Sequence, residues 1–277
     1  MLGNKVIYEV KGIGSVTFGD TRPYFCESFE ASSISSNCQT NTAIGVDGQT
    51  ASDITLQSKV VQCKFALLSL TKNQKAYDYE GLERMKEEII KIFNPKNTGV
   101  LTRINSRGVF QNEARPSETP IFENIVGASC RFSMNFVLDN PIWCGTREKV
   151  CTFDGPGDKS FFNNFGMDIP FILKGTVPAQ STFSIENLTN GKSIVLRSFK
   201  DYDMKFELDT ASCRVLAQTS EGGDMQRANY IFTASSDLDM ILESGENQLR
   251  YSVEGDYYTE DDKAISIVVY DRYVGVV

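Results

Sequence analysis

The sequence predicts a mainly β protein with two domains. We expect an N-terminal β-rich domain with one α-helix in residues 1–145 and a C-terminal β-sandwich in residues 146–277. One stretch, 78–101, repeats its apolar residues every three to four positions, as an amphipathic helix does. Two long stretches on either side of it alternate apolar and polar residues, which is typical of strands with one buried face. After Pro170, short strand-like segments follow one another without a helical period, which favours a sandwich.

The predicted helix begins after Asp78 and ends near Phe93. The carboxylate of Asp78 suits an N-cap, because it can accept hydrogen bonds from the free amides of the first turn. Pro95 cannot continue a helix, and it disfavours helical backbone at Asn94. The apolar stripe consists of Leu82, Met85, Ile89, Ile92 and Phe93. Because a lone helix of this length is marginal in water, we expect the stripe to be buried on a sheet.

The two alternating stretches are the expected long strands of that sheet. Their apolar positions are Val61, Cys63, Phe65 and Leu67 before the helix, and Cys130, Phe132, Met134, Phe136 and Leu138 after it. Pro141 stops sheet pairing after the second long strand, because proline has no amide hydrogen to donate. Shorter strands are expected at 5–10, 16–18, 24–29 and 99–104, with a hairpin in 105–120.

Residues 32–52 form a polar stretch rich in Ser, Thr, Asn and Gly, with a turn signal at 46–48. A polar stretch of this length is unusual inside a compact domain and is often functional. We interpret it as a long loop or hairpin that reaches a neighbouring subunit. The candidates for inter-subunit hydrogen bonds are Asn37, Gln39, Asn41 and Asp47. A flexible surface loop or hairpin without such a partner is the alternative.

The stretch 152–164 contains Gly, Pro and Asp, so we interpret it as a linker or as the entry to the second domain. We expect a fragment of residues 164–277 to fold alone. The strands of the sandwich are expected at 171–175, 182–188, 193–196, 205–208, 214–216, 230–233, 248–253 and 264–270.

Composition and charge exclude several classes of protein. The 277-residue chain has a net charge of −8, and an acidic protein is a poor general binder of DNA or anionic membranes. No apolar run approaches the ~18 residues of a membrane-spanning helix, so we expect no membrane insertion. The N-terminal residues also lack the apolar block of a secretory signal.

The chain contains no histidine. This absence excludes Ser–His and Cys–His nucleophile pairs and every zinc site that uses a histidine. The acidic stretch 256–262 offers carboxylates that suit calcium, although a solvated loop is the more common result of such a stretch. We therefore expect no enzyme activity, no cofactor and no bound metal.

Four short motifs follow one another along the chain. They are the helix end Asn94-Pro95 followed by Gly99 and Leu101, the strand end DNPIW at 139–143, NLTNGKSI at 187–194, and LESGEN at 242–247. Their order and spacing resemble the distal tail protein family of long-tailed bacteriophages and prophages. The chain departs from the family pattern at Asn140, which is inserted, and at Ile142, which replaces a tyrosine.

The resemblance implies a structural component of a phage tail tip or baseplate. It implies N-terminal domains that form a hexameric ring around the tail channel, and a galectin-like C-terminal sandwich that points outward. The partners it implies are further copies of the chain, tail-tip and tail-tube proteins, and receptor-binding proteins, with DNA only passing through the channel. The implied location is the virion tail tip, after synthesis in the host cytoplasm. An acidic hub would suit a channel through which DNA slides.

A carbohydrate-binding module that mediates surface attachment is the alternative function, because sandwiches of this kind commonly bind sugars. Sugar sites usually contain an exposed aromatic side chain that stacks on the sugar ring. The only tryptophan, Trp143, lies outside the predicted sandwich, which leaves Tyr257 and Tyr258 as possible platforms. A hydrolase is a third alternative, and the absence of histidine counts against it.

The cysteines are predicted to be free thiols. The chain has 7 cysteines, an odd number, and no C-x-x-C pair. Cys63 and Cys130 lie on the apolar faces of the predicted long strands, where a thiol behaves as a small apolar group. Alkylation of the denatured, unreduced protein should therefore add 7 adducts to the intact mass. Two or more missing adducts would indicate a disulfide.

Overall fold

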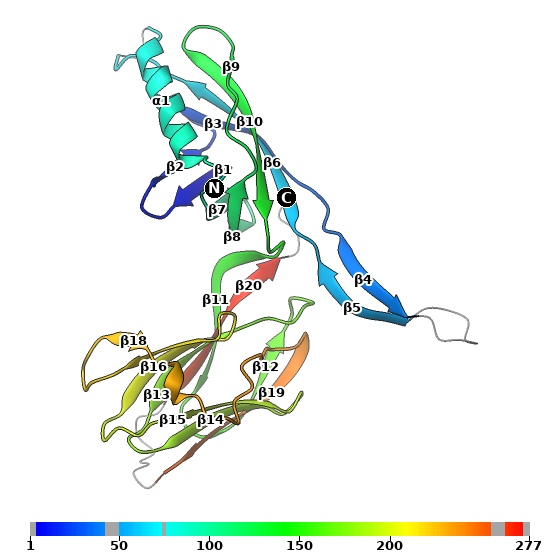
Figure 1. Ribbon diagram of the computed structural model, residues 1–277, viewed down its shortest axis with the longest axis vertical. Coiled ribbons are helices and arrows are strands. Elements are labelled where there is room, and N and C mark those ends of the chain that lie inside the picture. Colours follow the sequence, from blue (N-terminus) through cyan, green and yellow to red (C-terminus); the bar gives the residue numbers. More distant parts are fainter. Residues whose placement is uncertain (1–3, 42–49, 74–75, 256–263, 274–277) are drawn as a thin grey trace. The chain divides into compact units, whose positions relative to one another are not determined.

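The computed structural model describes residues 4–41, 50–73, 76–255 and 264–273 (Figure 1). The chain divides into two compact units, which we describe separately. Unit 1 comprises Met1–Thr146 and Arg272–Val277, and unit 2 comprises Arg147–Asp271. The described part of the chain is mainly β with one α-helix, as the sequence predicted.

Unit 1 contains the helix and most of the long strands. Its elements are β1 (Lys5–Val10), β2 (Gly14–Phe18), β3 (Tyr24–Ala31), β4 (Ser36–Asn41), β5 (Thr50–Leu56), β6 (Lys59–Leu68), α1 (Tyr79–Ile92), β7 (Gly99–Asn105), β8 (Gly108–Pro116), β9 (Glu123–Asn124), β10 (Ser129–Leu138) and the start of β11 (Trp143–Phe153). Strands β3, β6 and β10 are antiparallel neighbours in that order. Strand β10 also pairs with β8 at one end and with β9 at the other. Strands β8, β7, β1 and β2 continue the pairing in that order.

Helix α1 has the caps and the buried stripe that the sequence predicted. The side chain of Asp78 accepts a hydrogen bond from the Gly81 amide at 2.9 Å, which satisfies one free donor of the first turn. At the other end, the Asn97 side chain donates to the carbonyls of Lys91 and Ile92. The buried stripe residues are Leu82, Ile89, Ile92 and Phe93, and Met85 packs against the same core.

The core beneath the helix is largely aromatic. Phe93, directly after the helix, lies 5.3 Å from the ring of Tyr8 and 5.5 Å from that of Phe136. Phe18 stacks on Phe65 at 3.9 Å. These rings come from β1, β2, β6 and β10, so the helix end joins strands that are far apart in the sequence. Each fully buried side chain of this size contributes about 1.5–3 kcal/mol.

Replacing Ile89 by aspartate should destabilise unit 1 strongly. Ile89 is 0% exposed, so the substitution buries a carboxylate without a partner and removes apolar contacts. We expect a loss of about 3–5 kcal/mol in chemical denaturation. The matched control is Ile90→Asp on the next helical position, where the side chain is 44% exposed and the loss should stay within about 0.5 kcal/mol. Equal losses in the two variants would contradict the buried stripe.

Unit 2 is a β-sandwich. Its elements are the end of β11, β12 (Gly157–Asn163), β13 (Ile172–Val177), β14 (Thr182–Asn187), β15 (Lys192–Arg197), β16 (Met204–Asp209), β17 (Arg214–Gln218), β18 (Met225–Arg227), the 3-10 turn η1 (Asn229–Ile231), β19 (Gly245–Glu254) and β20 (Ile265–Tyr273). One sheet has the order β12-β19-β14-β15, and the other contains β18-β17-β16-β13-β20. Side chains from both sheets form one core, including Phe183 and Tyr251 from the first and Leu173 and Phe206 from the second.

Of the two interpretations of residues 152–164, the linker is wrong and the domain entry agrees with the structure, because the segment contains the end of β11, a turn and β12 of unit 2. The Gly-Pro-Gly composition at 155–157 suits a tight turn inside a domain as well as a linker between domains. The strand expected at 230–233 is replaced by the η1 turn. There the Asn229 side chain accepts a hydrogen bond from the Val215 amide and donates one to the Cys213 carbonyl. A side chain, and not the backbone of a neighbouring strand, therefore satisfies these two backbone groups.

Unit 2 should fold without unit 1. A fragment of residues 147–271 retains both sheets and the core, so we expect a single cooperative thermal transition. The shorter fragment 164–277, which the sequence suggested, lacks β12 and the core residues Phe153 and Phe161, and it should not melt cooperatively. A non-cooperative longer fragment would contradict the separate folding of unit 2.

Candidate assembly surfaces

The polar stretch 32–52 contributes to a hairpin that continues a strand pair of unit 1. Strand β3 leads into β4, and β5 leads into β6, so the hairpin prolongs the β3–β6 pair (Figure 1). Strands β4 and β5 are antiparallel, from Ser36 opposite Leu56 to Asn41 opposite Thr50. They form a separate two-stranded sheet, and no other described strand pairs with them.

Hydrogen bonds fix the base of the hairpin. The Ser32 amide donates to the Val60 carbonyl at 2.9 Å, and the Ser32 hydroxyl accepts from the Val60 amide at 3.2 Å. Three residues further on, the Gln57 amide donates to the Ser35 carbonyl at 2.9 Å. The hairpin therefore leaves unit 1 from an ordered base.

Beyond its base, the described side chains of β4 and β5 lie outside both hydrophobic cores, and Leu56 is 43% exposed. A two-stranded hairpin is at best marginally stable by itself in water. Its two outer edges also carry backbone donors and acceptors that invite pairing with another chain. A hairpin of this length is therefore typical of a segment that is stabilised by a partner.

Three of the four residues predicted to contact a neighbouring subunit lie on strand β4. Asn37 is exposed on β4, and its side-chain oxygen accepts a hydrogen bond from Gln57 Nε2 of the same chain. Gln39 and Asn41 lie on β4 opposite Ser52 and Thr50, and their side chains are outside the described part. Asp47 lies outside the described residues. Their contact with a second subunit stays a prediction.

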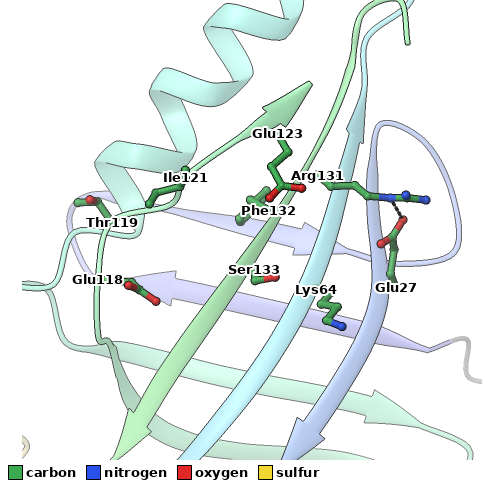
Figure 2. Close-up of a pocket in the computed structure, with 9 residues that line it drawn as sticks. All are labelled: Glu27, Lys64, Glu118, Thr119, Ile121, Glu123, Arg131, Phe132 and Ser133. Atoms are coloured by element: carbon green, nitrogen blue, oxygen red, sulfur yellow. Dashed lines mark hydrogen bonds and ion pairs between the residues drawn. The ribbon is translucent and has the colours of Figure 1, made fainter. Parts of the chain in front are cut away.

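A hollow of about 580 Å³ lies on the polar face of the sheet formed by β3, β6 and β10 (Figure 2). Its position follows from the pairing of β10. Residues 130–131 pair with β9 and residues 136–137 pair with β8, which leaves four residues of β10 facing the six-residue loop 117–122. The two extra residues make this loop bulge away from β10. The lining residues are Glu27, Lys64, Glu118, Thr119, Ile121, Glu123, Arg131, Phe132 and Ser133.

The hollow is polar, and its charges are open to water. Arg131 Nε donates to Glu27 Oε1 at 2.7 Å across the sheet, the ion pair drawn in Figure 2. Asn135 Nδ2 lies 3.5 Å from Glu118 Oε1. The lining holds no cysteine, and its hydroxyl groups have no histidine to activate them. This arrangement suits a contact surface better than an active site. No local sequence pattern predicts this hollow, because it depends on the register of β10 with two different strands.

The negative charge of the protein lies in unit 2. Unit 1 has 16 Lys and Arg against 15 Asp and Glu, a net charge of +1, and unit 2 has 12 against 21, a net charge of −9. The charge count therefore gives no support to an acidic N-terminal hub. Total composition could not place the charge, because it averages two units of opposite sign.

Burial keeps several thiols unreactive. Burial raises the pKa of the Cys63 thiol far above its usual value, and it also raises the pKa of Cys26, Cys130 and Cys151. A protonated thiol is a poor nucleophile and a poor metal ligand.

Among the described residues, no group of three His, Cys, Asp or Glu side chains could hold a metal ion, and no helix is long and apolar enough to cross a membrane. The acidic stretch 256–262 lies outside the described residues, as do Tyr257 and Tyr258.

The motifs that suggested a family have structural roles. A side chain at Gly99 would meet the Glu9 carbonyl oxygen at 2.4 Å, so β1 and β7 can approach only because this residue is glycine. In unit 2, Asn187 Nδ2 donates to Asn247 Oδ1 at 2.9 Å, and both side chains are fully buried. Asn247 also bonds the backbone of Glu243 twice, which fixes the turn before β19.

The fold defined by these two units is that of phage hub and baseplate proteins. The SPP1 Dit (gp 19.1) protein, described as a paradigm of the hub adsorption apparatus in phages that infect Gram-positive bacteria, matches with a TM-score of 0.65 and 14% identity over 98% of this chain and 99% of that one. A chain of the phage P2 baseplate, solved in its activated conformation with Ca, matches with a TM-score of 0.55 and 10% identity over 97% and 98% of the two chains. No family model and no curated protein matches the sequence. The resemblance to distal tail proteins is thus confirmed at the level of the fold.

Proposed function

We propose that this chain is a structural subunit of a phage tail tip or baseplate, located in the virion tail after synthesis in the host cytoplasm. The observation that carries the proposal is the end-to-end match of both units to phage hub and baseplate chains. A shared sandwich would match unit 2 alone, whereas this match also includes the helix-bearing unit 1. The described residues contain no group of three His, Cys, Asp or Glu side chains that could hold a metal ion, and the hollow of unit 1 is polar and lacks a nucleophile pair, which supports a structural role.

Unit 1 forms the ring of this assembly, and the β4–β5 hairpin makes the contact between neighbours. The described side chains of the hairpin belong to neither core, and no other described strand pairs with its edges, so a neighbouring copy is the partner that would complete it. A contact between two different surfaces closes into a ring when its rotation divides a full turn. The number six comes from the resemblance to the distal tail protein family alone.

Other tail proteins are the remaining partners. In this proposal the ring links the tail tube to the tip and to the receptor-binding apparatus, and DNA only passes through the central channel. Unit 2, with a net charge of −9, repels DNA, whereas unit 1 with its net charge of +1 is nearly neutral. Low net charge in the ring suits passage of DNA without tight binding, because affinity for DNA grows with the number of phosphates that basic residues neutralise.

Removing the hairpin should abolish ring formation and leave the fold intact. The Gln57 amide already donates to the Ser35 carbonyl, which is the bond that closes a two-residue turn. Replacing residues 36–56 by Asn-Gly therefore joins two residues that are already paired. We expect rings from the full chain and monomers from the deletion variant, by native mass spectrometry and negative-stain imaging over a concentration series.

Two controls make this result interpretable. The deletion variant should unfold within about 1 kcal/mol of the parent, because no described core side chain is removed. The fragment Arg147–Asp271 should stay monomeric at every concentration. Rings from the deletion variant or from the isolated sandwich would contradict the proposal. A full chain that stays monomeric at high concentration with tail proteins present would contradict it as well.

A further inference from the structure

One lysine of unit 1 reaches from helix α1 to strand β9. Lys86 Nζ donates to Asn124 Oδ1 at 3.1 Å, across 38 residues of sequence, and to Glu83 Oε1 at 2.8 Å. The side chain of Lys86 is only 12% exposed, whereas that of Glu83 is 67% exposed. An amine, a carboxamide and a carboxylate therefore meet at the place where α1 contacts β9 (Figure 1).

The surroundings of Lys86 differ from those of an ordinary ion pair on a helix. Such a pair normally lies in water and contributes little to stability. Here the Phe122 ring lies 5.9 Å from Lys86 Nζ, and it packs in turn against Phe132 with the ring centroids 5.1 Å apart. Burial raises the pKa of the nearby Cys130 thiol, so this thiol stays protonated and does not compete as a nucleophile. The lysine amine is the nucleophile of this cluster.

We propose that Lys86 and Asn124 form an intramolecular isopeptide bond. Lys86 Nζ forms a bond to the Cγ carbon of Asn124, and the bond between Cγ and Nδ2 of Asn124 breaks. The Nδ2 atom leaves as ammonia, so the reaction needs no oxidant, no metal and no second substrate. The product is a secondary amide that joins α1 to β9 covalently.

Glu83 transfers the protons that this reaction requires. Only a neutral amine attacks a carbonyl carbon, and Glu83 Oε1 can accept the proton of Lys86 across the 2.8 Å contact. The resulting carboxylic acid then protonates the departing Nδ2 atom as a general acid. In total, two protons pass from Nζ to Nδ2, and the ammonium group and the carboxamide become one secondary amide and one ammonium ion.

The carbon that is attacked lies within reach of the amine. Cγ of Asn124 is bonded, at about 1.2 Å, to the oxygen atom that Lys86 Nζ contacts. The terminal torsion of asparagine is soft, so a small rotation turns the face of the carboxamide toward the amine. The backbone of Asn124 is held by pairing with Cys130 of β10. Asn124 is exposed, which gives the departing ammonia a path to water.

A second contact between a lysine and an asparagine lacks the carboxylate. Lys149 Nζ donates to Asn164 Oδ1 at 2.6 Å and lies 4.2 Å from the Phe165 ring centroid. Within the described part of the chain, the ion pairs of lysine include none from Lys149. Without a base beside the amine, we expect this pair to remain a hydrogen bond, so it serves as an internal control.

The test is mass spectrometry of the purified full chain after prolonged incubation at neutral and mildly alkaline pH. The intact mass should fall below the encoded mass by one ammonia molecule. A tryptic digest should contain one branched peptide that joins Lys86 to Asn124. Because Asn190-Gly191 can also lose ammonia by forming a succinimide, the branched peptide is the decisive signal.

Three variants identify the role of each group. Glu83→Gln keeps a polar side chain but removes the base, and it should slow formation of the branched peptide by about a hundredfold or more. Lys86→Arg keeps the positive charge and the donors but should give no branched peptide, because the guanidinium group stays protonated. Lys149→Arg is the matched control and should react like the parent chain. All three variants should keep the circular dichroism spectrum of the parent.

Lack of the branched peptide in the incubated parent chain would overturn the proposal. An unchanged rate in the Glu83→Gln variant, or an equal yield of a branched peptide that joins Lys149 to Asn164, would overturn it too. The inference rests on the contacts of Lys86 alone and does not depend on ring assembly.

Discussion

The architecture of unit 1 depends on one pair of β-strands, β3 and β6, which extends beyond the hydrophobic core. Within the core, β3 and β6 are held by β10 and by the aromatic cluster beneath the helix. Beyond Ala31 and Lys59 the same two strands continue as the β4–β5 hairpin, which backbone pairing and the side-chain hydrogen bond from Gln57 to Asn37 support. In the proposed assembly, a neighbouring copy of the chain supplies the further surface that covers this hairpin.

The two units differ in net charge and in the way their cores are enclosed. Unit 1 is nearly neutral, contains the helix-covered core and carries the hairpin, all of which suit repeated contacts between identical subunits. Unit 2 carries the net charge of −9 and encloses its own core between two sheets, so it needs no partner for stability.

The features that could be predicted from the sequence are those that local physical chemistry determines. The Asp78 cap, the buried stripe through Ile89 and the alternating long strands each follow from residue spacing alone. The hollow of unit 1 depends on how β10 registers with β8 and β9, which no local pattern encodes. Phe161 and Phe162 show the same limit, because two identical neighbours point to opposite faces and the sequence does not say which one is exposed. Trp143, the aromatic residue that composition singled out, is fully buried in unit 1.

Hydrogen–deuterium exchange of the full chain at low and high protein concentration tests the central claim most directly. An isolated two-stranded hairpin opens readily, so its amides exchange fast unless another chain covers them. We predict that the amides of residues 36–41 and 50–56 become protected from exchange as the chain assembles, while the amides of β14 and β19 in unit 2 keep the same exchange rates. Assembly without added protection in the hairpin would contradict the claim that the hairpin joins neighbouring subunits.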